Sequence, residues 1–329
     1  MIGRREFITL LGGAAAAWPL AARAQQGRMR RIGVLMSQPA DNSEAQARFA
    51  AFLQALQQLG WTEGRNLLID TRWRVGRDAD GIRNSAAELV ALAPDVILSS
   101  ATPQTAALQQ ATRNVPIVFA MVLDPVGGGI VEGLARPGGN VTGFMQFEYS
   151  LSGKWLELLL QIAPNVKRAA VLRDARNPTG IGQFAVLQAM APMLGVEVVP
   201  INLLDAAEIE RGVANFASFS NGGLIATGGQ ATTHLPLIVA LAARHRLPAV
   251  YPYRFFVSGG GLISYGPDLI EQHRLAASYV DRILRGEKPA DLPVQAPTKY
   301  ELVINLKTAK TLNLELPATV LARADAVIE

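Results

Sequence analysis

The order of strand-like and helix-like segments in this chain occurs twice. In the first half, the segments lie at 30–37, 43–59, 67–73, 80–92, 95–99, 103–113 and 117–123. In the second half, the corresponding segments lie at 167–174, 181–194, 196–201, 206–216, 224–227, 237–246 and 247–250. Strands that alternate with helices predict parallel sheets with right-handed crossovers. Because the matches come in the same order, they predict two similar parallel α/β lobes.

Three linkers, near Gln146, Gly266 and Val294, predict crossings between these lobes. The N-terminal lobe is expected to hold 28–145 and 268–294, and the C-terminal lobe 146–267 and 295–329. The tail predicts a long helix at 268–285, a strand at 300–305 and a final helix at 317–328. A hinge of three segments permits the lobes to close about a defined axis.

Residues 1–24 are typical of an export signal peptide. Arg4 and Arg5 precede an apolar run of about 13 residues, which is shorter than the ~20 that a membrane span needs. The twin arginine favours the twin-arginine route over the general one. The chain has no cysteine, which excludes disulfides and a lipid-modified cysteine. We therefore expect a soluble periplasmic protein that is not a lipoprotein and is not inserted in the membrane after cleavage.

The sequence gives little support to an enzyme. It has no nucleophile elbow, phosphate loop or zinc motif, and the first strand ends without a glycine fingerprint for a dinucleotide. His234, His245 and His273 are scattered, which favours surface or capping roles over metal ligands. The glycines at 127–129 and 259–261 favour turns beside a hinge over a phosphate cradle. We predict no catalysis, no cofactor and no metal.

Charge gives no support to nucleic-acid binding. The net charge of +4 falls to +2 once the three arginines and one glutamate of the leader are removed. A repressor with this lobe architecture would need a DNA-binding helix-turn-helix where this chain has its leader.

In parallel α/β sheets, ligands bind beyond the carboxyl ends of the strands. That rule selects the following ligand-binding candidates: Ser37, Gln38, Ser100, Thr102, Asp124, Asn177, Gln230, Tyr253, Arg254 and Tyr265.

Each candidate role has a structural alternative. Thr102 precedes Pro103 as a helix N-cap, so the N–H groups there suit a carboxylate, or the threonine only caps the helix. Asp124 suits an ammonium or hydroxyl group, or it starts a turn. Arg254 suits an anion, or it is a surface charge. Tyr253 and Tyr265 suit an aromatic ring, or they pack between elements.

Several motifs resemble the substrate-binding proteins of the tryptophan/tyrosine-type ABC uptake family over essentially the whole mature chain. They are RIGVL at 31–35, LGW at 59–61, DPV at 124–126, LARPGGNVTG at 134–143, GLISYGPD at 261–268 and ELVINLKTA at 301–309. The resemblance implies the type I periplasmic-binding-protein fold, and it places cleft loops at Ser37, Thr102, Asp124, Asn177, Gln230 and Tyr265.

The resemblance also implies a function and its partners. It implies capture of a small ligand between the lobes, an amino acid or related carboxylate, since some relatives bind aromatic amino acids. The partners are then an ABC permease and, through it, ATPase subunits, and the protein is expected to be a monomer. One alternative is a periplasmic sensor subunit of the same fold. Another is a hydrolase or isomerase with its base in the cleft.

Overall fold

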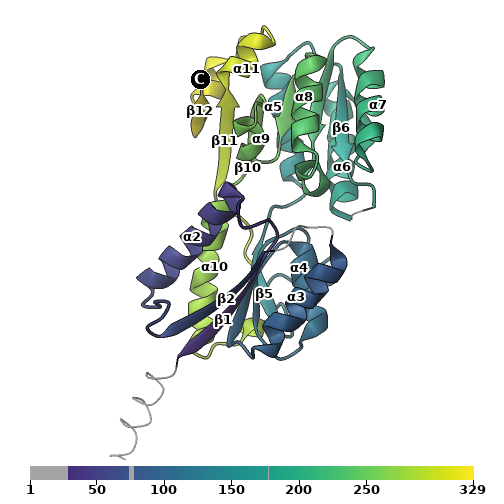
Figure 1. Ribbon diagram of the computed structural model, residues 1–329. Helices are drawn as coiled ribbons and strands as arrows, with labels where there is room; N and C mark the ends of the chain where they lie inside the picture. The colour runs from purple at the N-terminus through teal and green to yellow at the C-terminus, as the bar shows by residue number, and fades with distance from the viewer. Residues whose placement is uncertain (1–28, 74–77, 177) are drawn as a thin grey trace, which may run out of the picture.

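The computed structural model describes residues 29–73, 78–176 and 178–329, which form two α/β lobes (Figure 1). The predicted leader and the candidate Asn177 lie outside these residues. We call the lobe that contains the first sheet the first lobe and the other the second lobe.

The first lobe contains a sheet of five parallel strands in the order β2-β1-β3-β4-β5. The strands are β1 (Arg30–Met36), β2 (Leu67–Trp73), β3 (Val96–Ser100), β4 (Ile117–Val122) and β5 (Val141–Met145). Every residue of β3 and β5 is buried, whereas β2, at the edge, fully buries only Leu67. The continuous apolar runs of the sequence therefore mark strands that are covered on both faces.

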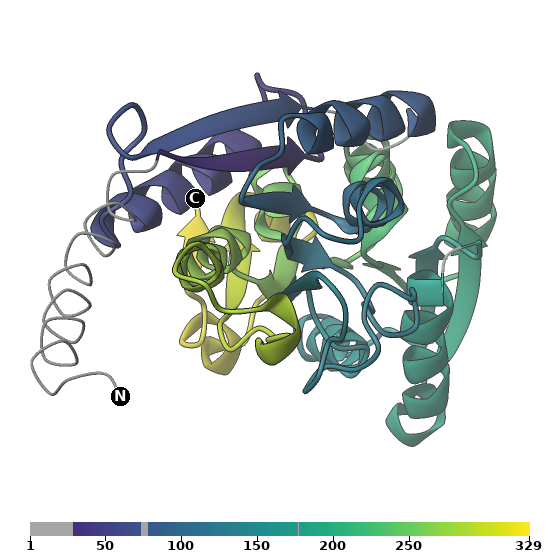
Figure 2. The same cartoon turned by 90° about the horizontal axis from the view of Figure 1, so that it is seen from below.

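Helices cover both faces of this sheet (Figure 2). They are α2 (Ser43–Gln58), α3 (Ala79–Ala91), α4 (Thr102–Ala111) and α10 (Leu269–Leu284), with a 3-10 turn, η3 (Pro289–Asp291). α2 and α10 pack on the face of Val34, and α3 and α4 on the face of Leu35. Asn42 and Asp78 cap α2 and α3, because each side chain accepts a backbone N–H of the first turn.

The second lobe repeats this sheet and extends it. Its strands are β6 (Arg168–Arg173), β7 (Glu197–Asn202), β8 (Gly222–Ala226), β9 (Ala249–Tyr251), β10 (Ile263–Pro267), β11 (Tyr300–Asn305) and β12 (Ala326–Ile328). The order β7-β6-β8-β9-β10 matches β2-β1-β3-β4-β5, and β11 and β12 follow at the β10 edge. The prediction of two similar parallel lobes is confirmed, and antiparallel β11 is an addition.

The helices of the second lobe enclose one large core around the fully buried Trp155. They are α5 (Leu151–Ile162), α6 (Pro178–Met190), α7 (Ala206–Ala217), α8 (Leu235–Arg244), α9 (Arg254–Ser258), α11 (Leu306–Thr311) and α12 (Ala318–Leu321), with 3-10 turns η1 (Ala191–Leu194) and η2 (Gly229–Thr232). The helix expected at 181–194 is divided into α6 and η1, because Pro192 has no N–H to continue the α-helical bonds.

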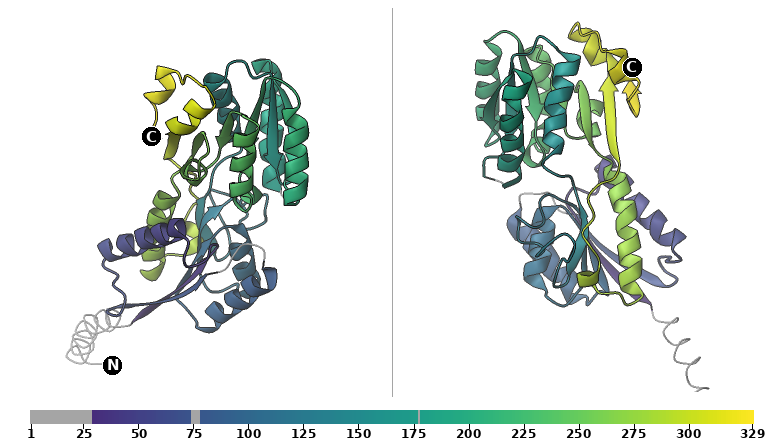
Figure 3. Two further views of the ribbon diagram at one scale, coloured as in Figure 1. Left: turned by 45° about the horizontal axis from the view of Figure 1, so that its top comes forward. Right: turned by 180° about the vertical axis from the view of Figure 1, so that it is seen from behind.

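The lobes exchange helices where the chain crosses between them. β5 belongs to the first lobe and the following α5 packs in the second, while β10 belongs to the second and α10 packs beside α2 in the first (Figure 3). The Gln272 amide donates to the carbonyls of Met145 (3.1 Å) and Gln146 (3.0 Å). Lys299 donates to Asp268 at 2.8 Å. These bonds join the three crossings to one another.

The final helix predicted at 317–328 is wrong. α12 ends at Leu321, and the chain then forms β12 parallel to β11. The backbone N–H of Asp325 donates to the Leu302 carbonyl, and the Asp325 carboxylate accepts the Leu302 N–H, both at 2.8 Å. Pairing with an open sheet edge therefore replaces the helical bonds of this segment.

The surface or capping role predicted for His273 is also wrong, because this side chain on α10 is fully buried. Its Nδ1 lies 2.9 Å from the Leu269 carbonyl oxygen, and its Nε2 lies 3.4 Å from the Ser100 hydroxyl. Burial, helped by the charge of Arg48, lowers the pKa of His273 to about 3. His234 and His245 occupy the positions that flank α8.

We expect the buried imidazole to make the protein sensitive to acid. The folded-state pKa lies below that of an exposed histidine, so the unfolded chain takes up the proton first, and stability is lost as the pH falls from ~6.5 toward 3. Relative to His273→Phe, the wild-type free energy of unfolding should fall by about 2 kcal/mol between pH 6.5 and 4.5. Urea unfolding at several pH values measures this, with His245→Phe as control. Parallel pH profiles for wild type and His273→Phe would contradict it.

Candidate functional site

The carboxyl ends of β3 and β4 carry unusual backbone. Ala101 (φ +80°), Met121 (φ +61°) and Asp124 (φ +36°) all adopt left-handed conformations, although none is glycine. Met121 also lies at the point where the register between β4 and β5 shifts. Such conformations cost ~1–3 kcal/mol each and concentrate at ligand-binding sites. Three left-handed residues therefore lie at the edge of the sheet that the sequence selected, and one more, Ala93, precedes β3 at the opposite edge.

Four side chains pack against one another below this edge. Arg48 of α2 donates from Nη1 to the Met121 sulfur at 3.2 Å, and the Ser100 hydroxyl lies 3.8 Å from the same sulfur. Ser100 also contacts His273. Arg48 is 3% exposed, Ser100 1% and His273 0%. A guanidinium is thus buried beside a neutral imidazole and a thioether.

Aromatic side chains of the second lobe lie opposite this cluster. Tyr253 is buried, with its ring 6.4 Å from that of Phe147 and 5.1 Å from that of Phe255. Burial raises the pKa of Tyr253 well above its usual value, and the charge of Arg48 and a hydrogen bond from the Gly229 N–H offset part of that rise. The charge of Arg48 in the first lobe is therefore near enough to Tyr253 in the second lobe to affect its pKa.

Asp124 joins the first lobe to the linker that leaves it. One carboxylate oxygen accepts the Gly127 N–H at 2.8 Å, which closes a turn. The other accepts the Tyr149 hydroxyl at 2.7 Å. Burial and the bond to Asp124 raise the pKa of Tyr149 to about 12, and Thr179 also hydrogen-bonds to this tyrosine. The turn reading of 127–129 is supported, because Gly128 also donates to the Asp124 carbonyl.

The structure brings the first-lobe candidates together at one edge. Ser37 and Gln38 follow β1 and are half-buried, Ser100 ends β3, and Asp124 follows β4. Thr102 is not the N-cap, because Ala101 occupies that position and Thr102 is the first residue of α4. Its hydroxyl instead accepts the N–H of Leu123 at 3.3 Å, which fixes the loop after β4.

The second-lobe candidates are divided among different places. Gln230 lies in η2 beside the Gly229 that bonds Tyr253. Arg254 forms an ion pair with Glu301 at 2.8 Å. Tyr265 stacks on Tyr300 and lines a separate cavity of about 320 Å³. Its other lining residues are Lys154, Glu157, Leu158, Gln161, Tyr300, Leu302, Arg323 and Asp325.

Sequence reasoning missed Arg48, His273, Phe147 and Tyr149. A signal for Arg48 was available, because it precedes Phe52 by four residues and Leu56 by eight, which places it on the apolar face of α2. His273 similarly shares a face with Ala277 and Val280. No comparable signal marks Phe147 or Tyr149, which lie in a linker.

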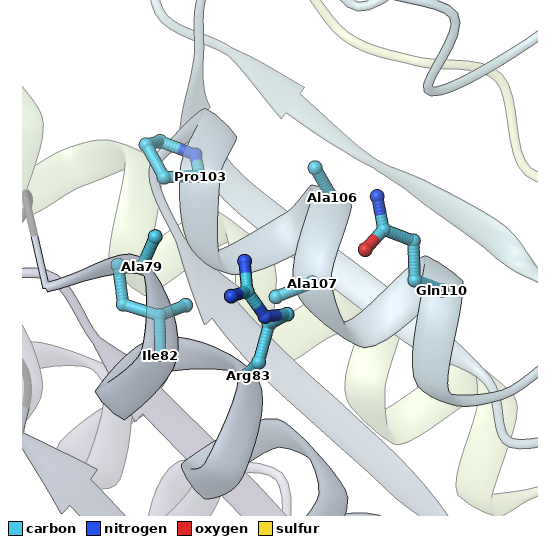
Figure 4. A pocket seen from close by; sticks show the side chains of 7 residues that line it. All are labelled: Ala79, Ile82, Arg83, Pro103, Ala106, Ala107 and Gln110. Carbon is cyan, nitrogen blue, oxygen red and sulfur yellow. The ribbon is translucent and has the colours of Figure 1, made fainter.

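Two other features lie away from this region. A groove of about 180 Å³ separates α3 and α4 and is lined by Ala79, Ile82, Arg83, Pro103, Ala106, Ala107 and Gln110 (Figure 4). Its arginine is paired with Asp80. Within residues 29–73, 78–176 and 178–329, no cluster of three or more His, Asp or Glu side chains suits a metal ion. None of the helices in those ranges is long and apolar enough to span a membrane.

Comparisons with known proteins agree with this architecture. A tyrosine-binding protein of Clostridioides difficile (strain R20291) is 26% identical over 288 residues, which are 88% of this chain and 82% of that protein. An ABC domain from Streptococcus pneumoniae, solved with L-Trp, is 27% identical with a TM-score of 0.82, covering 91% of this chain and 99% of that one. A ligand-free, open substrate-binding protein from Clostridium difficile, with 25% identity and the same coverage, gives a TM-score of 0.72.

The fold is shared more widely than the sequence. A solute-binding protein from Bacillus halodurans with bound myo-inositol is 14% identical and gives a TM-score of 0.57. The two similar parallel lobes are those of the type I periplasmic binding proteins. The family model for ABC transporter substrate binding protein matches residues 31–328. The chain therefore belongs to the family of ABC transporter substrate-binding proteins.

Proposed function

We propose that this protein binds an amino acid with an aromatic side chain between its lobes and delivers it to the permease of an ABC uptake system. The observation that supports this most is that Arg48 of the first lobe and the aromatic Tyr253 of the second are both buried and lie near enough for the charge of Arg48 to lower the pKa of Tyr253. Relatives that cover most of the chain include a tyrosine-binding protein and an L-Trp complex. The family consists of solute-binding proteins, which are not enzymes.

In this proposal the first lobe supplies the polar contacts. Asp124 accepts from the ligand's ammonium group with the lone pairs that Gly127 and Tyr149 leave. Ser37, Gln38, Ser100 and Thr102, which lie along the same edge, donate or accept further hydrogen bonds.

The second lobe supplies the surface for an aromatic ring, from Tyr253 and Phe147, together with amide groups from Gln230 and Asn177. Arg254 and Tyr265 are left out of the proposed site, because one is paired with Glu301 and the other lines a separate cavity.

We propose that the lobes, divided as 28–145 with 268–294 and 146–267 with 295–329, close around the ligand. The bond from Tyr149 on the linker to Asp124 stabilises the closed arrangement. The higher TM-score with the L-Trp complex (0.82) than with the open ligand-free protein (0.72) supports the view that the described arrangement is a closed one. A ligand promotes closure only if it binds the closed form more tightly.

Export and partners follow from the same proposal. The leader at 1–24 directs the chain to the periplasm, where the mature monomer delivers its ligand to a permease and its ATPase subunits. We prefer transport to sensing, because the family whose model matches the chain is that of ABC transporter substrate-binding proteins.

The first test is ligand binding. L-Tyr, L-Trp and L-Phe should each raise the unfolding temperature of the purified mature protein by several degrees when the ligand concentration is about 100 times Kd. A ligand that binds only the folded state adds ~2.7 kcal/mol to the free energy of unfolding at that concentration. Calorimetric titration then gives the Kd. Organic acids without an amino group and neutral sugars serve as controls. A shift with sugars and none with any amino acid would exclude the proposed ligand class.

The second test concerns closure. Tyr149→Phe removes only the hydroxyl that bonds Asp124, so the affinity for the aromatic amino acid should fall about 5-fold, which corresponds to ~1 kcal/mol for one hydrogen bond. Small-angle scattering of ligand-free protein should show a larger radius of gyration for the variant. Tyr300→Phe, at the separate cavity, is the matched control. Unchanged affinity and radius in Tyr149→Phe would show that this bond does not stabilise closure.

A further inference from the structure

Arg48 is a buried cation with no buried anion beside it. Its Nε donates to the Glu44 carbonyl of its own helix at 3.1 Å, and its Nη1 donates to the Met121 sulfur at 3.2 Å. Among the residues that the structure describes, no carboxylate lies within 4 Å of its nitrogens, whereas twelve other basic side chains have such a partner. Burial lowers the pKa of Arg48, although the charge of Glu44 opposes that change.

A buried guanidinium without a carboxylate partner destabilises the folded protein. Transfer of a charge out of water is unfavourable unless a counter-charge and hydrogen bonds replace the solvent. A thioether sulfur is a weak acceptor, and a neutral backbone carbonyl supplies only part of what a carboxylate gives. Five N–H bonds of a guanidinium are available as donors, and the two contacts use only two of its nitrogens.

No group that the structure describes around Arg48 neutralises its charge, so the guanidinium can bind an anion between the lobes. The groups that face it are Glu44 on its own helix, His273 on α10 and Tyr253 on the second lobe. The imidazole and the phenol are both neutral near pH 7, so neither competes for an anion nor neutralises the guanidinium. Met121, which accepts from Arg48, is one of the strained residues at the carboxyl end of β4.

We propose that Arg48 binds the anionic group of the ligand, a carboxylate, and thereby selects carboxylates over amides and amines that carry the same side chain. The inference rests on the proposed function and identifies the residue that recognises the carboxylate of the ligand. Arg254, the arginine that the sequence indicated for this role, already has Glu301 as its partner and is far more exposed than Arg48. A planar guanidinium matches a carboxylate with two parallel hydrogen bonds, which favours arginine over lysine at such a position.

The test compares L-tyrosine with L-tyrosinamide, which differ only at the carboxyl group, by calorimetric titration at pH 6, where both amino groups carry a proton. Wild type should bind tyrosine about 100-fold more tightly than the amide, since removal of one charged partner from a buried hydrogen-bonded pair lowers the affinity by about that factor. Arg48→Met should bind the two compounds within about 5-fold of each other. Arg48→Lys should keep part of the discrimination, and Arg274→Met, on the exposed side of α10, should keep all of it.

The unfolding temperatures of the same variants provide a second test, which needs no ligand. Arg48→Met replaces an unpaired buried charge by an apolar side chain, so the ligand-free variant should unfold several degrees above wild type, while Arg274→Met should not. A lower unfolding temperature for Arg48→Met would overturn the inference, because it would show that the guanidinium is already satisfied within the protein.

The outcomes separate this inference from the proposed function. If wild type binds neither tyrosine nor tryptophan, the proposed ligand class is wrong, and the carboxylic acid of the panel that binds is then compared with its own amide in the same variants. If no carboxylate binds at all, the inference fails with it. If wild type binds tyrosine and Arg48→Met weakens tyrosine and tyrosinamide by equal factors, the proposed function stands and Arg48 acts only through packing.

Discussion

The exchange of α5 and α10 between the lobes is the constraint on which the rest of the structure depends. α10 follows a strand of the second lobe but packs with α2 on the first, where Trp61 also donates to its Asp281 at 2.8 Å. Neither lobe is therefore a continuous piece of chain. Because the crossings are hydrogen-bonded to one another through Gln272 and Asp268, relative motion of the lobes is concentrated in a few residues near them.

This connectivity also places the functional groups. Since β1–β5 of the first sheet and β6–β10 of the second are parallel, and the chain crosses between the lobes after β5 and after β10, strand-end loops from both lobes gather in one region. Elsewhere in the described chain, basic residues such as Arg30 and Arg168 are paired with carboxylates, and left-handed residues such as Asn221 lie in turns. Between the lobes, an arginine is buried without a carboxylate, and the backbone at Met121 and Asp124 is strained. These two features therefore lie in the region where we propose that the ligand binds.

Much of the fold was predictable because buried segments have recognisable apolar patterns in the sequence. Buried strands such as β4 appear as apolar runs, and Gly60 and Gly195 mark helix ends by their positive φ. The segment after Leu321 was not predictable from local periodicity, since its pairing with β11 depends on a sheet edge formed elsewhere. For the site, the rule of strand ends located Asp124, Thr102 and Tyr253. It could not reveal Arg48, which comes from a helix, or the ion pair that occupies Arg254.

The placement of α10 has a consequence for the order in which this protein can form. The apolar face of α2 packs against a helix that begins at Leu269, more than 200 residues later in the chain. The first lobe therefore stays incomplete while most of the second lobe is being synthesised, and its closing contacts have a large sequence separation. Contacts of this kind slow folding, because a long loop must close before they form. The N-terminal segment thus carries all five strands of its own sheet, but one face of that sheet lacks the cover of α10 until the strands of the second lobe up to β10 have been made.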